Sequence, residues 1–186
     1  MCIRDRFVIG GLVTVLHFFQ VSVLSDQGLD SSVAARMIAI SALTMVICMP
    51  FVGKLYDGVK TRYVVAAAML LIAIALYAIT VVTDFTSGVV YAVVFGATNA
   101  FMLTMFGYIW PRYFGRAHLG SIQGVGQMFG VVGASIAPVP VGYAIDTFGS
   151  ASVVLKVLAL ASAAVAVFVV LKLRTPAAME KPAHLE

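Results

Sequence analysis

Long apolar runs separated by short polar segments dominate the chain. Six such runs cover about residues 7–25, 33–53, 63–83, 88–110, 119–142 and 151–173. Each run is close to the 20 or so apolar residues that a helix needs to cross a bilayer, and none alternates apolar and polar residues as barrel strands do. The separators contain charged residues, glycine or proline, which favour turns. The pattern therefore predicts an all-α integral membrane protein with six transmembrane helices.

The composition supports this membrane assignment and narrows the chemistry. Of 186 residues, 62% are hydrophobic and 11% are charged, whereas a soluble domain has roughly 25% charged residues. A soluble or disordered protein is therefore excluded. Basic loops beside a bilayer explain the net charge of +4 better than nucleic-acid binding does. Cys2 and Cys48 lack metal-ligand spacing, so we expect no metal, no disulfide and no cofactor.

The basic residues are distributed unevenly between the predicted loops. Ten of the twelve lie in the termini and in the second and fourth loops: Arg4, Arg6, Lys54, Lys60, Arg62, Arg112, Arg116, Lys172, Arg174 and Lys181. The opposite loops hold four aspartates and no basic residue: Asp26, Asp30, Asp84 and Asp146. Because positive loops face the cytoplasm, we expect a multi-pass protein of the cytoplasmic (inner or plasma) membrane with both termini in the cytoplasm.

The ends of the chain differ from the rest. Residues 1–6 hold three charges and lead abruptly into an apolar run, so we interpret them as a non-native scar and exclude them from the fold. We expect residues 7–173 to form the six-helix bundle and residues 174–186 to form a cytoplasmic tail. On this interpretation the chain is the carboxyl part of a longer protein. The alternative is a natural six-helix half that pairs with a second copy.

Two blocks of three spans resemble each other. The third and sixth spans contain almost no polar residues, so we expect both to face lipid. The sequence Gly-x-x-x-Asp follows a proline after the second span, at Gly53–Asp57, and after the fifth, at Gly142–Asp146, 89 residues later. The two copies fall on opposite sides of the predicted bilayer. This arrangement predicts an inverted 3+3 repeat.

The segment after the second span carries a recognisable motif. Residues 53–62 resemble the cytoplasmic loop signature of the major facilitator superfamily, and four positions match: Gly53, Leu55, Asp57 and Arg62. Three positions depart from the signature: Gly58, Lys60 and Thr61. On physical grounds Gly53 allows a close helix approach, and the Asp57 carboxylate can pair with an arginine or a helix amino end and latch one conformer. The alternative is an ordinary charged loop.

A second loop narrows the resemblance. Phe114-Gly115-Arg116, followed by Gly120-x-x-x-Gly124, resembles the monocarboxylate and oxalate/formate-type branch of that superfamily. The resemblance implies one half of the major facilitator fold, helices seven to twelve, in a secondary active transporter rather than an enzyme. It also implies a cavity lined by the first, second, fourth and fifth spans, which a missing amino-terminal half or a second copy would complete. The substrate would be a small molecule, and a monocarboxylate or other organic anion is favoured.

Polar residues inside the first span are the strongest candidates for a substrate or proton site. His17 lies about ten residues into the span, or roughly 15 Å deep, and Gln20 lies nearly one turn further on. An ionisable residue at that depth is by default a functional hypothesis. His17 could carry a coupling proton in a symport mechanism or bind an anion. The alternative is a neutral histidine bonded to a neighbouring helix.

Three further residues could contact a solute. Asn99 is a single polar group on an apolar face with Phe95, and a core asparagine bonded between helices is an equal alternative. Gln127 lies deep in the fifth span. Arg36 could meet a carboxylate, or it could extend to the interface, as we expect for Lys156. We expect four glycines in the fifth span to serve helix packing: Gly120, Gly124, Gly126 and Gly130.

Two other classes of membrane protein fit less well. An intramembrane serine protease needs Gly-x-Ser-Gly and a later histidine, but Gly133-Ala134-Ser135-Ile136 lacks the last glycine and His17 comes earlier. We therefore assign no catalytic residue. A channel is disfavoured because no acidic filter or re-entrant loop is visible in the sequence.

Overall fold

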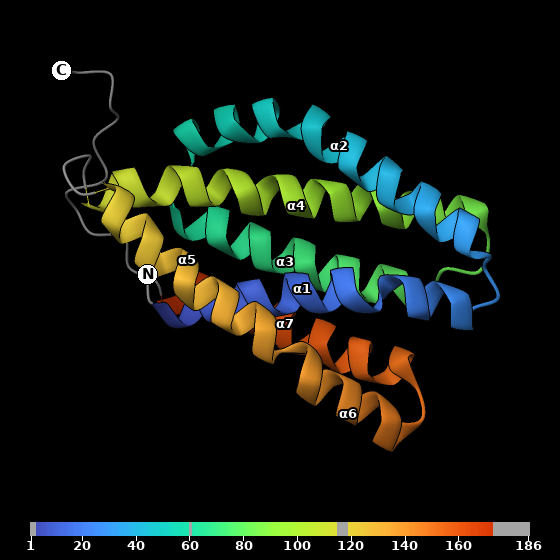
Figure 1. Ribbon diagram of the computed structural model, residues 1–186. Coiled ribbons are helices and arrows are strands. Elements are labelled where there is room, and N and C mark those ends of the chain that lie inside the picture. Colours follow the sequence, from blue (N-terminus) through green and yellow to red (C-terminus); the bar gives the residue numbers. More distant parts are fainter. Residues whose placement is uncertain (1–2, 60, 115–118, 173–186) are drawn as a thin grey trace.

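The computed structural model describes residues 3–59, 61–114 and 119–172, and all regular secondary structure within them is helical. Seven helices follow in order: α1 (Ile3–Asp26), α2 (Ser31–Gly58), α3 (Thr61–Ile79), α4 (Phe85–Phe114), α5 (Leu119–Ile136), α6 (Pro138–Phe148) and α7 (Ala151–Lys172). Successive helices alternate in direction, and α5 and α6 together cross the bundle once (Figure 1). The start of α1 and the end of α7 consequently lie at the same end of the bundle.

The apolar runs account for the membrane character of these helices. Within the described residues, four segments are long and apolar enough to cross a membrane: Ser32–Gly58, Phe85–Tyr108, Gly120–Phe148 and Ala151–Val169. Two shorter apolar segments, Gly10–Asp26 and Tyr63–Ile79, account for the first and third predicted spans. The order of apolar runs therefore agrees with the sequence pattern, although the helices extend beyond several of the predicted limits.

The fifth predicted span, 119–142, is two helices rather than one. Pro138 begins α6 and has no N–H to donate to the carbonyl four residues earlier. Pro140 removes a second bond one half-turn later, so the helical ladder is interrupted between Ile136 and Pro138. A single proline, Pro50, lies inside α2 without ending it. Two closely spaced prolines thus break a helix that one proline leaves continuous.

Glycine and a capping pair form the turns at one end of the bundle. Gly28 and Gly149 adopt positive φ angles of 82° and 65°, which glycine reaches without steric cost. At the start of α4, Asp84 Oδ1 accepts a hydrogen bond of 2.8 Å from the Ser87 backbone N–H, and Ser87 Oγ accepts one from the Asp84 N–H at 3.1 Å. This reciprocal pair satisfies backbone donors at the helix start. The Ser87 backbone and side-chain hydrogen bonds hold the pKa of Asp84 below its ordinary value of 3.8.

The helices pair in a regular pattern. α1 packs on α5, α2 packs on α4, and α3 packs on both α7 and α4. Figure 1 shows α2 along the upper edge of the bundle with α4 beneath it. The chain crosses the bundle six times, as α1, α2, α3, α4, α5 with α6, and α7. Exchanging the first three crossings with the last three replaces α1 by α4, α2 by α5 and α3 by α7. The α1–α5 pair then becomes the α4–α2 pair, and the α3–α7 pair is unchanged. These two exchanges are those expected of two equivalent three-crossing units, whereas the α3–α4 pair has no counterpart of similar extent between α7 and α1.

Close backbone approach defines two of these pairs. A Cβ at Gly96 of α4 would lie 2.7 Å from Thr44 Cβ of α2 and would also clash with the Ser41 carbonyl oxygen. A Cβ at Gly133 of α5 would clash with the Phe7 carbonyl oxygen of α1. Such distances are well below ordinary van der Waals contact, so both crossings require glycine.

The third predicted span, which was expected to face lipid, is α3, and only one side of α3 is exposed in the structure. Most of α3 is buried against its neighbours, through Val64, Val65, Ala66, Ala68, Met69, Ile72, Ala73, Ala75, Leu76 and Ile79. Among the side chains of α3 that the structure describes, one stripe is exposed: Tyr63, Leu70, Ile74 and Tyr77. Apolar residues suit a protein interior and a lipid-facing surface equally well, so the sequence could not separate the buried side of α3 from its exposed stripe. Frequent alanines let neighbouring helices approach α3 on several sides.

Candidate functional site between α1 and α4

Polar and aromatic side chains from α1 and α4 meet halfway along the bundle. The His17 ring lies 4.7 Å from the Phe95 ring, measured between centroids, at an angle of 57°. His17 is nine residues before the end of α1, or about 14 Å along the helix axis. The hydrocarbon core of a bilayer is about 30 Å thick, so this contact lies near its midplane if the bundle spans it.

His17 is exposed and hydrogen-bonded within its own helix. Its Nδ1 lies 2.9 Å from the Val13 carbonyl oxygen, one turn earlier. A carbonyl only accepts hydrogen bonds, so this contact requires the proton on Nδ1 and leaves Nε2 as the acceptor of a neutral ring. Nε2 is then the atom that can accept a hydrogen bond or take up a proton. The alternative interpretation expected His17 to form a hydrogen bond to a neighbouring helix. In the structure its hydrogen bond is to its own helix.

Gln20 lies inside the bundle and is bonded to a residue that the sequence did not single out. Gln20 is 5% exposed, and its Oε1 accepts a hydrogen bond of 3.3 Å from the Tyr91 hydroxyl. Tyr91 is 1% exposed and stacks on Phe95 at 5.7 Å with an interplanar angle of 10°. The chain of contacts from His17 through Phe95 and Tyr91 to Gln20 joins α1 to α4. We call these four residues the α1–α4 cluster.

Asn99 lies beside this cluster on α4. Its Nδ2 donates to the Phe95 carbonyl oxygen at 3.0 Å, one turn earlier, and the side chain is partly buried. The amide group is therefore held next to the aromatic residue that contacts His17. Tyr91, Phe95 and Asn99 follow one another at intervals of four, which places them on one face of α4. This spacing from Phe95 and Asn99 is the feature of the sequence that could have identified Tyr91.

Arg36 and Gln127 occupy other parts of the bundle. Arg36 is exposed on α2, five residues after its start. Gln127 is exposed on α5, eight residues after its start. The structure thus brings together His17, Gln20 and Asn99 from the sequence-based set.

The motif at residues 53–62 begins in a helix rather than in a loop. Gly53, Leu55 and Asp57 all lie in α2, which continues to Gly58. Nothing lies within 4 Å of a Cβ placed at Gly53, so the expected close helix approach is not made within the described residues. Leu55 and Asp57 are exposed. Arg62 lies in the first turn of α3, and its side chain is outside the described part of the structure.

Tyr56 is a buried residue of this motif and was not among the positions that match the signature. It is 0% exposed, and its hydroxyl donates to the Phe101 carbonyl oxygen of α4 at 2.7 Å. Its ring also packs against the rings of Phe101 and Tyr108, at 5.8 Å and 5.4 Å. Tyr56 therefore fixes the motif-bearing end of α2 to α4 while Leu55 and Asp57 point away from the interior.

The four glycines expected to pack α5 behave differently from one another. Nothing described lies within 4 Å of a Cβ placed at Gly120 or Gly124, so the expected close packing is not made there within this chain. Gly126 is buried. Gly130 does form a close contact, because a Cβ at Gly10 of α1 would lie 2.7 Å from its carbonyl oxygen.

Comparison with known proteins identifies the family. The family model described as Major Facilitator Superfamily matches residues 6–186. No curated protein and no solved structure matched the chain in the corresponding searches.

Proposed function

The chain belongs to the major facilitator superfamily, and from this premise we propose that it forms the carboxyl-terminal half, helices seven to twelve, of a secondary active transporter. The superfamily consists of membrane transporters rather than enzymes, and the apolar helices agree with a multi-pass membrane protein. The proposed substrate is a small organic solute, with a monocarboxylate or related anion favoured by the loop that resembles the oxalate/formate-type branch. It would cross the membrane by alternating access.

An inverted 3+3 repeat is proposed for the six crossings. The pairing of α1 with α5 and of α2 with α4 supports it, because the two pairs exchange under the repeat. The glycine contacts support it more sharply. Phe7 and Gly96 are 89 residues apart, and so are Thr44 and Gly133, so the Phe7–Gly133 contact and the Gly96–Thr44 contact are equivalent. The same offset separates the two Gly-x-x-x-Asp copies, Gly53–Asp57 and Gly142–Asp146.

The proposal for the substrate site is based on the α1–α4 cluster. A polar group inside hydrocarbon needs a partner, since leaving it unsatisfied costs several kcal/mol. Gln20 has that partner in Tyr91, whereas His17 presents Nε2 from an exposed ring. A few polar groups on an aromatic wall are typical of sites for small organic ligands. His17, Gln20 and Asn99 would contact the solute, with Arg36 and Gln127 contributing from α2 and α5.

Proton coupling is proposed for His17. Histidine is the side chain whose charge most readily changes near neutral pH. Taking up a proton on Nε2 would place a positive charge beside a bound carboxylate, which links the two binding events. The transporter would then act as a proton symporter.

We also propose that residues 53–62 form a gate at the cytoplasmic face. With the bundle ends assigned by the basic residues, both termini and the end of α2 face the cytoplasm of the inner or plasma membrane. Leu55 and Asp57 would then meet the partner half of the transporter, together with Gly53 and Arg62. Tyr56 would hold that end of α2 in place on α4.

The proposed site needs a partner to complete the cavity. Large apolar side chains are exposed along α2 and α5: Leu43, Val46, Ile47, Phe51, Val125, Met128 and Val131. A preceding six-helix half of the same protein is the proposed partner. A second copy of this chain is the alternative, and the mass of the purified chain in detergent distinguishes them, since a stable dimer would support the second copy.

Counterflow in proteoliposomes tests the transporter proposal. The chain, expressed together with its partner half, is reconstituted with an excess of unlabelled monocarboxylate inside and a trace of labelled solute outside. A carrier accumulates label transiently above equilibrium, whereas a pore only equilibrates it. Accumulation with monocarboxylates but not with sugars or organic cations is expected. Equilibration without overshoot for every solute would contradict the proposal.

A further inference from the structure

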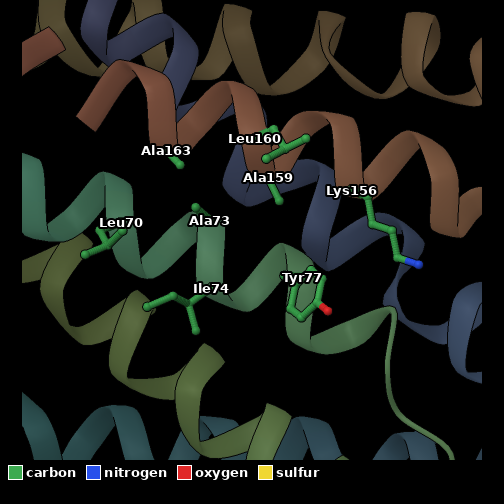
Figure 2. Close-up of a pocket in the computed structure, with 8 residues that line it drawn as sticks. All are labelled: Leu70, Ala73, Ile74, Tyr77, Lys156, Ala159, Leu160 and Ala163. Atoms are coloured by element: carbon green, nitrogen blue, oxygen red, sulfur yellow. The ribbon is translucent and has the colours of Figure 1, made fainter. Parts of the chain in front are cut away.

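A shallow apolar groove of about 430 Å³ runs between α3 and α7, away from the α1–α4 cluster (Figure 2). Its walls and floor are aliphatic or alanine side chains: Leu70, Ala73, Ile74, Ala159, Leu160 and Ala163. Alanines at the base let the two helices approach while leaving a depression between the larger rim residues. The rim is open, since Leu160 is 73% exposed.

The groove has polar groups at one end only. Figure 2 shows Lys156 and Tyr77 together at that end, with Leu70 and Ala163 at the other. Lys156 lies five residues after the start of α7, which corresponds to about 8 Å along the helix axis. At that depth its flexible stem reaches the headgroup region of a bilayer while lying along apolar surface. The groove therefore runs from a cationic end near the interface into the hydrocarbon region.

The geometry points to a binding site for a glycerophospholipid with an anionic headgroup. One acyl chain lies along the alanine-lined floor, and the phosphate accepts hydrogen bonds from the Lys156 ammonium and the Tyr77 hydroxyl. Both groups donate hydrogen bonds, so their chemistry matches phosphate oxygens. The volume lies at the low end of the 300–1,000 Å³ range typical of small-ligand sites. This size suits a single chain rather than a packed helix.

A second copy of the chain fits this surface less well. None of the residues that line the groove is acidic, so a two-fold contact across it would bring two lysines together without a carboxylate between them. An anionic lipid neutralises the same lysine. Charge complementarity thus favours the lipid as the occupant.

Headgroup charge, and not chain burial, must give this site its selectivity. An acyl chain leaving the bilayer for the groove exchanges one apolar environment for another and gains no hydrophobic free energy. A basic residue near an anionic membrane surface contributes about 1 kcal/mol, which corresponds to about a fivefold preference. We therefore expect about a fivefold preference for anionic over zwitterionic lipid, and we expect it to depend on Lys156.

Quenching of a tryptophan beside the groove by brominated lipids measures this preference. The chain has one tryptophan, so the Trp110→Phe, Val157→Trp background carries a single reporter, at an exposed α7 position beside the groove that does not line it. The background is reconstituted into vesicles of phosphatidylcholine with increasing brominated phosphatidylglycerol, and the reverse series is run with brominated phosphatidylcholine. The ratio of the two quenching curves gives the relative affinity at the groove.

Matched variants isolate the lysine and the groove. Lys156→Gln is expected to lower the phosphatidylglycerol preference to near one, and Lys156→Arg is expected to retain it. Lys54→Gln removes the same charge from an exposed site on α2 and is expected to leave the preference unchanged. Ala163→Leu fills the groove and is expected to reduce quenching by both lipids, whereas Ala161→Leu, exposed on α7, is not.

Three results would overturn the lipid site. The first is equal quenching by the two headgroups in the background protein. The second is a preference that survives in Lys156→Gln. The third is weak quenching that rises when the protein is diluted in lipid, which would show that a second copy covers the groove.

Discussion

Replacing Gly96 with alanine tests whether the α2–α4 crossing depends on backbone contact. The new Cβ would lie 2.7 Å from Thr44 Cβ and would clash with the Ser41 carbonyl oxygen. A backbone carbonyl cannot rotate away, so α2 and α4 must separate. Overpacking of this kind costs about 1–3 kcal/mol, while alanine gains about 1 kcal/mol over glycine in a helix. The expected net effect is between no change and about 2 kcal/mol of destabilisation.

Gly107→Ala is the matched control on the same helix. Nothing described lies within 4 Å of a Cβ at Gly107, so only the helix-propensity gain of about 1 kcal/mol remains. The two variants are therefore expected to differ by the overpacking term alone, about 1–3 kcal/mol. For a chain of this length that corresponds to a difference in Tm of roughly 2–12 °C.

Thiol labelling during heating in detergent measures both variants. Cys48 is a free, partly buried cysteine on α2, and its reaction with a fluorogenic maleimide reports when α2 leaves the bundle. Cys2→Ser in every variant removes the other thiol. Gly96→Ala is expected to melt below the parent or level with it, and Gly107→Ala above it. Equal melting temperatures for the two variants would refute the close α2–α4 approach.

Three further outcomes are expected. His17→Gln should abolish the pH dependence of net uptake. It should preserve counterflow, because counterflow needs no net proton movement. An unchanged pH profile of uptake would rule out His17 as the coupling residue. Tyr56→Phe removes a hydrogen bond to the Phe101 carbonyl oxygen and should destabilise the chain by about 1 kcal/mol, whereas Tyr143→Phe, 75% exposed on α6, should have little effect in the same melting assay. The pKa of Asp84 is lowered in the folded chain, so its contribution to stability is present above pH 3.8 and is lost as the pH falls through the folded value. The Tm advantage of the parent over Asp84→Asn should shrink on acidification, and an advantage that grows at acid pH would contradict this.

Apolar run length predicted the order of the apolar helices, because twenty apolar residues leave a chain few alternatives. The turns between helices could also be predicted from their glycines, since Gly28 and Gly149 lie in turns with positive φ. The division of the fifth run at Pro138 was not predicted. The missing N–H groups of two prolines interrupt a helix even where every neighbouring residue is apolar.

The register between helices could not be predicted from the sequence. His17 and Gln20 were identified because polar groups are rare in the apolar runs. Tyr91 was missed because tyrosine is common in membrane helices, and its bond to Gln20 depends on how far α4 is displaced along α1. Gly120 and Gly133 look alike in sequence, but of the two only Gly133 closely approaches another described helix. Such distinctions require the positions of two helices at once.

Protection of position 17 by the transported solute tests the central claim most directly. His17→Cys is made in a background without other cysteines and expressed with the partner half, and its alkylation by a maleimide is followed with and without the solute that shows counterflow. Thr83→Cys, exposed in the turn before α4, is the control. A solute bound at the α1–α4 cluster should slow alkylation severalfold at position 17 and leave position 83 unchanged. Equal alkylation rates at position 17 with and without saturating solute would contradict a substrate site between α1 and α4.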